Sequence, residues 1–162
     1  MTTKKRLQRK ITLRYLPKRL TAKDRKKQAS MLLRSRKLYK KGQYYTRPKI
    51  ASFPNKKSHH LANAYNIYGV NNMKPTRKLA NATKCNIKTL KKIMNKGEGA
   101  YFSSGSRPSQ TAQSWGYARL ASALTGGNAS IVDFHLLNEG CQTNSLALKL
   151  AKLVRRRSRL RS

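Results

Sequence analysis

The side chains that could carry out catalysis are few and scattered. The 162 residues include four acids, Asp24, Glu98, Asp133 and Glu139, which lie far apart in the sequence. Metal-dependent nucleases and polymerases need clustered carboxylates, and this spacing does not offer them. Asp133 and His135 would point to different sides of a helix. No motif supports a Ser–His pair. The sequence therefore predicts a non-enzymatic protein without catalytic residues, metal, cofactor or small-molecule substrate.

Lysine and arginine supply the chemistry that the chain has in excess. There are 38 of them, and the formal net charge is +34. A compact body with this charge repels itself, so a polyanion or acidic neighbours must offset it. Guanidinium and ammonium groups form strong hydrogen bonds with phosphates. The predicted polyanion-binding residues are Lys4, Lys5, Arg6, Lys26, Lys27, Lys88, Lys91, Lys92, Lys96, Arg107, Arg155, Arg156, Arg157, Arg159 and Arg161.

Residues 76–97, TRKLANATKCNIKTLKKIMNKG, have the spacing of a helix-turn-helix. The apolar positions that would pack its two helices together are Leu79, Ala80, Ile87, Leu90 and Ile93. The positions left for solvent or a DNA groove are Asn86, Lys88, Thr89, Lys91, Lys92 and Asn95. Lys84 stands where the tight turn usually has glycine. The favoured interpretation is an ordinary αα-hairpin with a solvated lysine face, and the alternative is a helix that can enter a DNA groove.

Residues 96–111, KGEGAYFSSGSRPSQT, form a second candidate for phosphate binding. Their glycines free the backbone, and Arg107 precedes Pro108 and a helix start, so backbone amides could converge on an anion. The stretch is not a nucleotide P-loop, because the Gly-Lys-Ser/Thr ending is missing. The favoured interpretation is a structural loop.

The two cysteines and the N-terminus bear on the compartment. Cys85 and Cys141 fit neither a disulfide framework nor a CxxC zinc site, so we expect buried or inert thiols. No apolar run approaches the roughly 18 residues that cross a bilayer. Residues 1–7 are basic without an apolar stretch behind them, which predicts no secretory signal. An intracellular or intravirion setting is expected.

The charge is unevenly distributed and suggests a division of the chain. Residues 1–57 carry net +20 and residues 58–108 net +8, whereas residues 109–142 carry net −1 and residues 143–162 net +7. A neutral stretch rich in Ala, Leu and aromatics indicates the packed centre. We expect a mainly α protein with a single small helical domain. Its predicted parts are a basic N-terminal helix and extended arm (1–57), a helical core domain (58–142) and a basic C-terminal helix or tail (143–162).

Capping residues place most of the expected helices. Thr21 with Asp24 three residues later starts a long basic helix that stops at Gly42. Pro48 and Pro54 favour an extended arm over residues 43–57. The other expected helices run from Ser58 to Gly69, from Ala112 to Leu124 after a cap at Ser109 or Thr111, from Ser130 to Asn138, and from near Asn144.

The C-terminal segment is expected to be an apolar helix that runs into the arginine cluster at Arg155–Arg161. It could lie on nucleic acid, on an anionic membrane face, or in the acidic groove of a protein neighbour. Because residues 1–20 and 143–162 carry much charge, they are expected to contribute little surface to the core and to be ordered by a partner.

Three strings carry a resemblance. They are LPKRLTAKDRKKQ (16–28), SRKLYKKGQYYTRPKIASF (35–53), and KGEGAYFSSGSRPSQTAQSWGYARLASALTGG with VDFHLL and GC (96–141). Together they resemble an uncharacterised family of small basic proteins of large double-stranded DNA viruses of algae and protists. The resemblance covers roughly residues 15–141. It implies a viral origin and a place in the particle, and it supplies no catalytic residue.

Charge and resemblance together lead to one expected function and two alternatives. The expected function is that of a structural protein of the virion, a minor capsid or core component made in the host cell cytoplasm. Its basic arms would bridge acidic capsid surfaces or genomic DNA, with an anionic inner membrane as a further partner. The alternatives are a helix-turn-helix DNA-binding regulator and a ribosomal-type RNA-binding protein.

Overall fold

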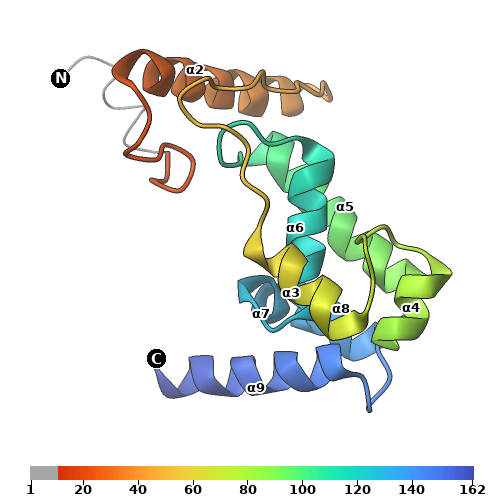
Figure 1. The fold of residues 1–162 in the computed structure, drawn as a ribbon. Helices are drawn as coiled ribbons and strands as arrows, with labels where there is room; N and C mark the ends of the chain where they lie inside the picture. The colour runs from red at the N-terminus through yellow and green to blue at the C-terminus, as the bar shows by residue number, and fades with distance from the viewer. Residues whose placement is uncertain (1–10) are drawn as a thin grey trace. The chain divides into compact units, whose positions relative to one another are not determined.

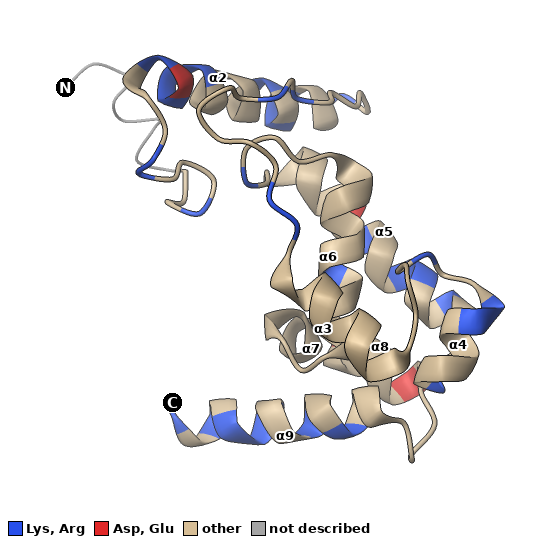
Figure 2. Ribbon diagram, in the orientation of Figure 1, with Lys and Arg blue, Asp and Glu red and all other residues tan. Residues whose placement is uncertain are grey.

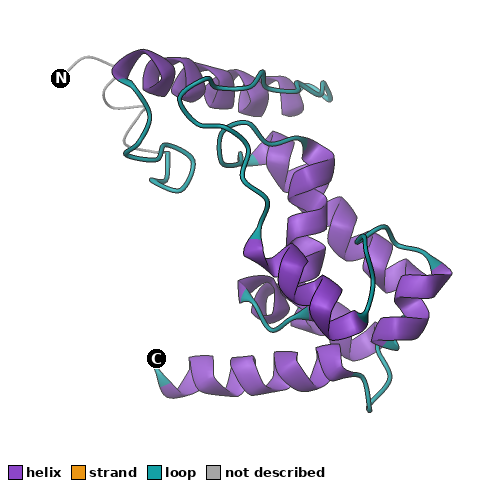
Figure 3. Ribbon diagram, in the orientation of Figure 1, coloured by secondary structure: helices purple, strands orange, loops and turns teal. Residues whose placement is uncertain are grey.

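The computed structural model describes residues 11–162, so Lys4, Lys5 and Arg6 lie outside the described residues. Within this range the chain forms helices joined by loops, without a strand, which confirms the mainly α prediction (Figure 3). The β-type pairings that occur in this range are isolated bridges, between Ile50 and Phe53 and between Cys85 and Cys141.

Eight helices are present among the described residues (Figure 1). Their bounds are α2 Ala22–Tyr39, α3 His59–Tyr68, α4 Arg77–Thr83, α5 Ile87–Ser103, α6 Ala112–Leu124, α7 Asn128–Val132, α8 Phe134–Gly140 and α9 Leu146–Leu160.

The residues group into two compact units, neither of which is a continuous stretch of chain. Unit 1 consists of the described residues up to Lys56 together with Glu98–Trp115. Unit 2 consists of Lys57–Gly97 and Gly116–Ser162. The covalent chain therefore passes between the units three times, once in a loop and once within each of α5 and α6.

Several predicted helix starts are confirmed by their caps. The Thr21 hydroxyl accepts from the Asp24 N–H at 3.2 Å, and the Ser58 hydroxyl accepts from the His60 N–H at 3.3 Å. The Thr111 hydroxyl accepts from the Ser114 N–H at 3.0 Å, and α6 has the predicted bounds. These bonds satisfy amides that have no partner inside the helix.

Two predicted helix bounds are wrong. Helix α5 continues past Gly97 and Gly99 to Ser103 instead of ending at the first glycine. A glycine inside a helix costs about 1 kcal/mol, and the burial of Tyr101, which is fully enclosed, favours continuing the helix. The single helix expected over residues 130–138 is instead α7 and α8, which are separated at Asp133.

Unit 1 packs α2 against the extended arm and the end of α5. Its core consists of Ile11, Leu16, Leu20, Ala29, Met31, Leu32 and Ile50. Residues 43–57 are not helical, as predicted, and the arm is anchored by Ile50, which is 1% exposed. Gly105 has a φ of +133°, and a Cβ there would lie 2.8 Å from Leu32 Cδ2. Only glycine allows this close approach of the loop to α2.

Unit 2 holds the larger core, and α9 belongs to it. Ala147, Leu148 and Ala151 are at most 2% exposed and join the core residues of the other unit 2 helices. Helix α9 packs against α7 and α8. The expectation that residues 143–162 add little to the core is therefore wrong. The same expectation for residues 1–20 is wrong within the described range, because Ile11, Leu16 and Leu20 are buried in the unit 1 core. Charge dominates the composition of residues 143–162, but their small apolar residues are spaced to form one buried face.

Candidate nucleic-acid interface

The first helix of the hairpin and its turn are set by local hydrogen bonds. The Thr76 hydroxyl caps α4 by accepting from the Leu79 N–H at 3.4 Å. Lys84 adopts the left-handed conformation, with a φ of 55°, and its N–H bonds to the Ala80 carbonyl. The turn therefore has the geometry that the sequence predicts, although a lysine occupies the position that favours glycine.

The second helix begins at Asn86, whose side-chain oxygen accepts from the Thr89 N–H at 2.7 Å. Leu79, Leu90 and Ile93 are buried, at 2%, 0% and 0% exposed, which confirms the packing side of the predicted helix-turn-helix. The prediction that Thr89 is available to solvent or a DNA groove is wrong. It is 6% exposed rather than available to a groove. A Cβ on Gly140 would overlap the Thr89 side chain, so α5 meets the end of α8 at this point.

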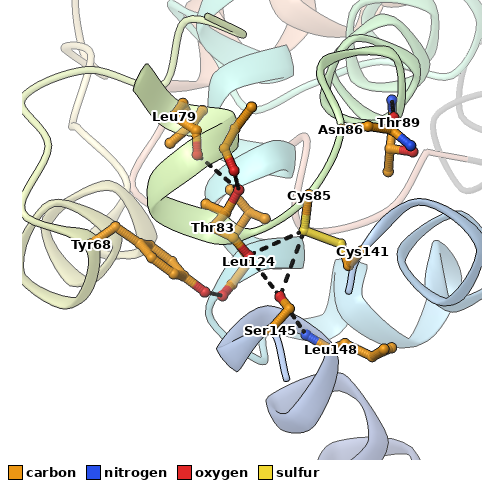
Figure 4. The surroundings of a disulfide bond; sticks show 11 residues. Tyr68, Leu79, Thr83, Cys85, Asn86, Thr89, Leu124, Cys141, Ser145 and Leu148 are labelled. Carbon is orange, nitrogen blue, oxygen red and sulfur yellow. Dashed lines mark hydrogen bonds between the residues drawn. A yellow bond between two sulfur atoms is a disulfide. The ribbon is translucent and has the colours of Figure 1, made fainter. Parts of the chain in front are cut away.

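A disulfide fixes the turn to the segment after α8 (Figure 4). Cys85 and Cys141 are bonded, and the Asn86 N–H to Gly140 O and Gln142 N–H to Lys84 O bonds flank them at 2.9 and 2.8 Å. Cys85 and Cys141 thus face each other as a non-hydrogen-bonded antiparallel pair, the type of pair in which the two side chains lie closest together. The expectation of free thiols is therefore wrong, although both cysteines are buried as expected. The two cysteines are 56 positions apart in the sequence, and this separation alone does not indicate that they pair.

Ser145 ties the start of α9 to the same turn. Its hydroxyl donates to the Thr83 carbonyl at 2.7 Å, accepts from the Leu148 N–H at 3.5 Å and lies 3.7 Å from Cys85 Sγ (Figure 4). Ser145 is fully buried. The hairpin turn, the disulfide and the first turn of α9 therefore form one connected structure.

The outer face of the hairpin is cationic. Lys88, Lys91 and Lys92 are all exposed on α5, as predicted, and Asn95 is exposed one turn further on. Figure 2 shows these basic positions on α5 together with those of α4. A solvent-open depression of about 700 Å³ lies over the turn and the disulfide, at the start of α5. Its charged lining includes Arg77, Lys84 and Glu139.

Lys96, the last predicted binding residue of α5, forms an ion pair within its own chain, although its side chain is 41% exposed. The fully buried Asp133 carboxylate accepts from Lys96 Nζ at 2.8 Å and from Arg119 Nε and an Arg119 terminal nitrogen, also at 2.8 Å. Burial by itself would raise the pKa of Asp133, but the bonds from Arg119 and Lys96 outweigh it and lower the pKa. Asp133 is thus a structural carboxylate. Its position in a neutral part of the sequence does not indicate that it pairs with Arg119 and Lys96.

The remaining predicted residues lie on both units. Lys26 and Lys27 are exposed on α2, and Arg107 is exposed in the loop after α5. On α9, the half-buried Arg155 stacks 4.2 Å above the Phe134 ring. The exposed arginines of α9 and its C-cap are Arg156, Arg157, Arg159 and Arg161.

The predicted phosphate-binding segment, residues 96–111, contacts the buried Arg47 of the same chain. Arg47, which the sequence analysis missed, donates to Ser35 Oγ at 2.9 Å, Tyr101 O at 2.8 Å and Ser106 Oγ at 2.9 Å. Its guanidinium also lies 3.8 Å from the centre of the Tyr101 ring. Burial lowers the pKa of Arg47. The Ser106 hydroxyl of the loop therefore accepts from a buried arginine of the same chain, which favours the structural interpretation. Arg47 is the only arginine among residues 43–57, but its residue type does not indicate that it is buried.

Residues 11–162 offer neither a cluster of metal ligands nor a helix that could span a membrane. These residues contain no group of three or more His, Cys, Asp and Glu side chains placed to hold a metal ion. No helix among them is both long and apolar enough to cross a membrane.

The fold and these surfaces define a class, that of small, strongly basic, all-helical proteins with cationic outer faces. The chain belongs to a family of unknown function, DUF5824, whose family model matches residues 12–135. The match includes α2 to α7 and stops before Cys141 and α9. No curated protein and no solved structure matches the chain.

Proposed function

We propose that this protein is a non-enzymatic structural component of a DNA virus particle that holds genomic DNA through its cationic surfaces. The observation that carries the proposal is the placement of the positive charge. Among the described lysines and arginines, Arg47 alone is buried. The ion pairs formed in this range are those of Lys96 and Arg119 with Asp133. Most of the other described lysines and arginines are exposed. A formal net charge of +34 needs an external polyanion to offset it.

Two further features support a place in a particle. The sequence resembles small basic proteins of large double-stranded DNA viruses over most of its length. A structural disulfide also fits a protein that functions after release from the reducing cytosol, because such bonds persist on virions and outside cells. Stepwise disruption of purified particles tests the placement. The protein should remain with the DNA-containing fraction, and its absence from particles would contradict the proposal.

The first prediction concerns salt. Each phosphate neutralised by lysine or arginine releases counterions, so the logarithm of affinity falls with the logarithm of salt at about −0.9 per contact. Engagement of about six phosphates should lower duplex affinity roughly a thousandfold between about 50 and 200 mM salt. Fluorescence anisotropy with two duplexes of unrelated sequence measures this, and both should give the same slope. A slope near zero would show that phosphates are not the partner.

The helix-turn-helix regulator is a second candidate, favoured by the turn geometry at Lys84 and the exposed lysines of α5. The variant Lys88→Ala with Lys92→Ala separates the two functions. If α5 reads bases, discrimination between a preferred site and random DNA should fall by about 1–3 kcal/mol per lost contact.

We expect the other result, a modest loss of affinity that is equal for all sequences, with a salt slope shallower by about 2. The matched control is Lys26→Ala with Lys27→Ala, which removes the same charge from α2. A footprint restricted to particular DNA sequences, lost only in the α5 variant, would favour the regulator.

A further inference from the structure

Three leucines of α9 are exposed in a row. Leu146 is 45% exposed, Leu153 42% and Leu160 83%. They are seven residues apart, close to two helical turns, so they lie on one side of the helix. We call these three residues the leucine row. The described chain leaves more than two-fifths of each of these residues exposed.

The orientation of α9 is fixed, so the exposure of the leucine row is built into the fold. Ala147, Leu148 and Ala151 hold another side of the helix in the core of unit 2. The Ser145 cap and its bond to Thr83 anchor the first turn. A rotation that buried the leucine row would remove the core residues from their places.

Cations border the leucine row along the length of α9. Lys149, Lys152, Arg156 and Arg159 are exposed and follow one another at spacings of three and four residues, so they form a second row beside the leucines. Residues 143–162 contain no acid. In Figure 2 the basic positions recur along the whole helix.

We propose that α9 docks on an anionic lipid surface, with the leucine row entering the boundary of the acyl chains and the basic row contacting the headgroups. An apolar face beside lysines and arginines is typical of helices that lie in the membrane interface. Acidic lipids attract such cations. Duplex DNA would satisfy the basic row but would give the leucines no apolar contact. A second copy of α9 would cover the leucines, but the two helices carry only positive charges and would repel each other.

The docking is tested by sedimenting the full-length protein with vesicles. The protein should bind vesicles of phosphatidylcholine mixed with phosphatidylglycerol and should leave vesicles of phosphatidylcholine alone unbound. The variant Leu153→Ser with Leu160→Ser should lower the affinity for the anionic vesicles about tenfold. Its affinity for duplex DNA should be unchanged, which distinguishes this inference from the proposed function.

Controls keep the test specific to α9. Leu13→Ser removes a leucine that is 68% exposed in unit 1 and should bind vesicles like the unaltered protein. Unchanged thermal unfolding of the α9 variant shows that the fold is kept, since both leucines are outside the core. Equal binding to neutral and anionic vesicles, or full binding by the α9 variant, would overturn the proposal, as would capture of α9 by an acidic protein in place of lipid.

Discussion

Reducing the Cys85–Cys141 bond is expected to lower the free energy of unfolding of unit 2 by about 4 kcal/mol. The bond closes a loop with a sequence separation of 56. In the chain-entropy account, a cross-link over a loop of this size restricts the unfolded state by about that amount. The affected region should be the hairpin turn and the start of α9, which share the bonds around Ser145. Denaturant unfolding with and without reductant measures the difference.

A double variant gives the control for this prediction. Cys85→Ala with Cys141→Ala should unfold at the lower denaturant concentration whether or not reductant is present. The amides of Asn86 and Gln142, which bond across the bridge, should exchange faster in the variant than in the oxidised protein. If the oxidised and reduced proteins unfold at the same midpoint, the bond does not stabilise the fold.

Asp133→Asn should be the second most disruptive change, with a loss of about 3 kcal/mol in the free energy of unfolding. The amide keeps the shape but leaves Arg119 and Lys96 without a carboxylate, and breaking a buried pair in this way typically costs 3–5 kcal/mol. The lower end applies because the side chains of Lys96 and Arg119 are 41% and 23% exposed. Glu139→Gln, at an exposed acid, is the matched control and should change the stability little.

The same carboxylate predicts a pH dependence. The folded pKa of Asp133 is lowered, so its contribution is fully present above the unfolded pKa near 4 and is lost as the pH falls through the folded pKa. Urea unfolding at a series of pH values from neutral to acid should show this decline in the unaltered protein. Asp133→Asn should lack that part of the decline. An identical pH profile in both would show that the two ion pairs contribute nothing.

The helices could be predicted where local chemistry determines them. Thr21, Ser58 and Thr111 cap helices because their hydroxyls reach amides two or three residues away, and the apolar spacing of Leu79, Leu90 and Ile93 reports a packing side directly. These signals are contained in a few consecutive residues. The sequence therefore predicted α6 and the hairpin well.

The features that could not be predicted depend on partners far along the chain. Cys85 meets Cys141, and Arg47 meets Tyr101 and Ser106, only after the fold has formed. The same holds for the candidate interface. The sequence marks its cations by type, but only the structure shows that Lys96 is engaged by Asp133 while Lys88 and Lys92 face solvent.

The disulfide also decides how the protein would respond to tension. A load applied between the two ends of the chain runs along the backbone to Cys85, crosses the sulfur–sulfur bond and continues from Cys141. The covalent path bypasses the residues between them, which include Glu98–Trp115, the segment that completes unit 1. Stretching the oxidised chain therefore extends unit 1 through its first segment alone, whereas reduction places the shielded residues under load and lengthens the chain that can be extended.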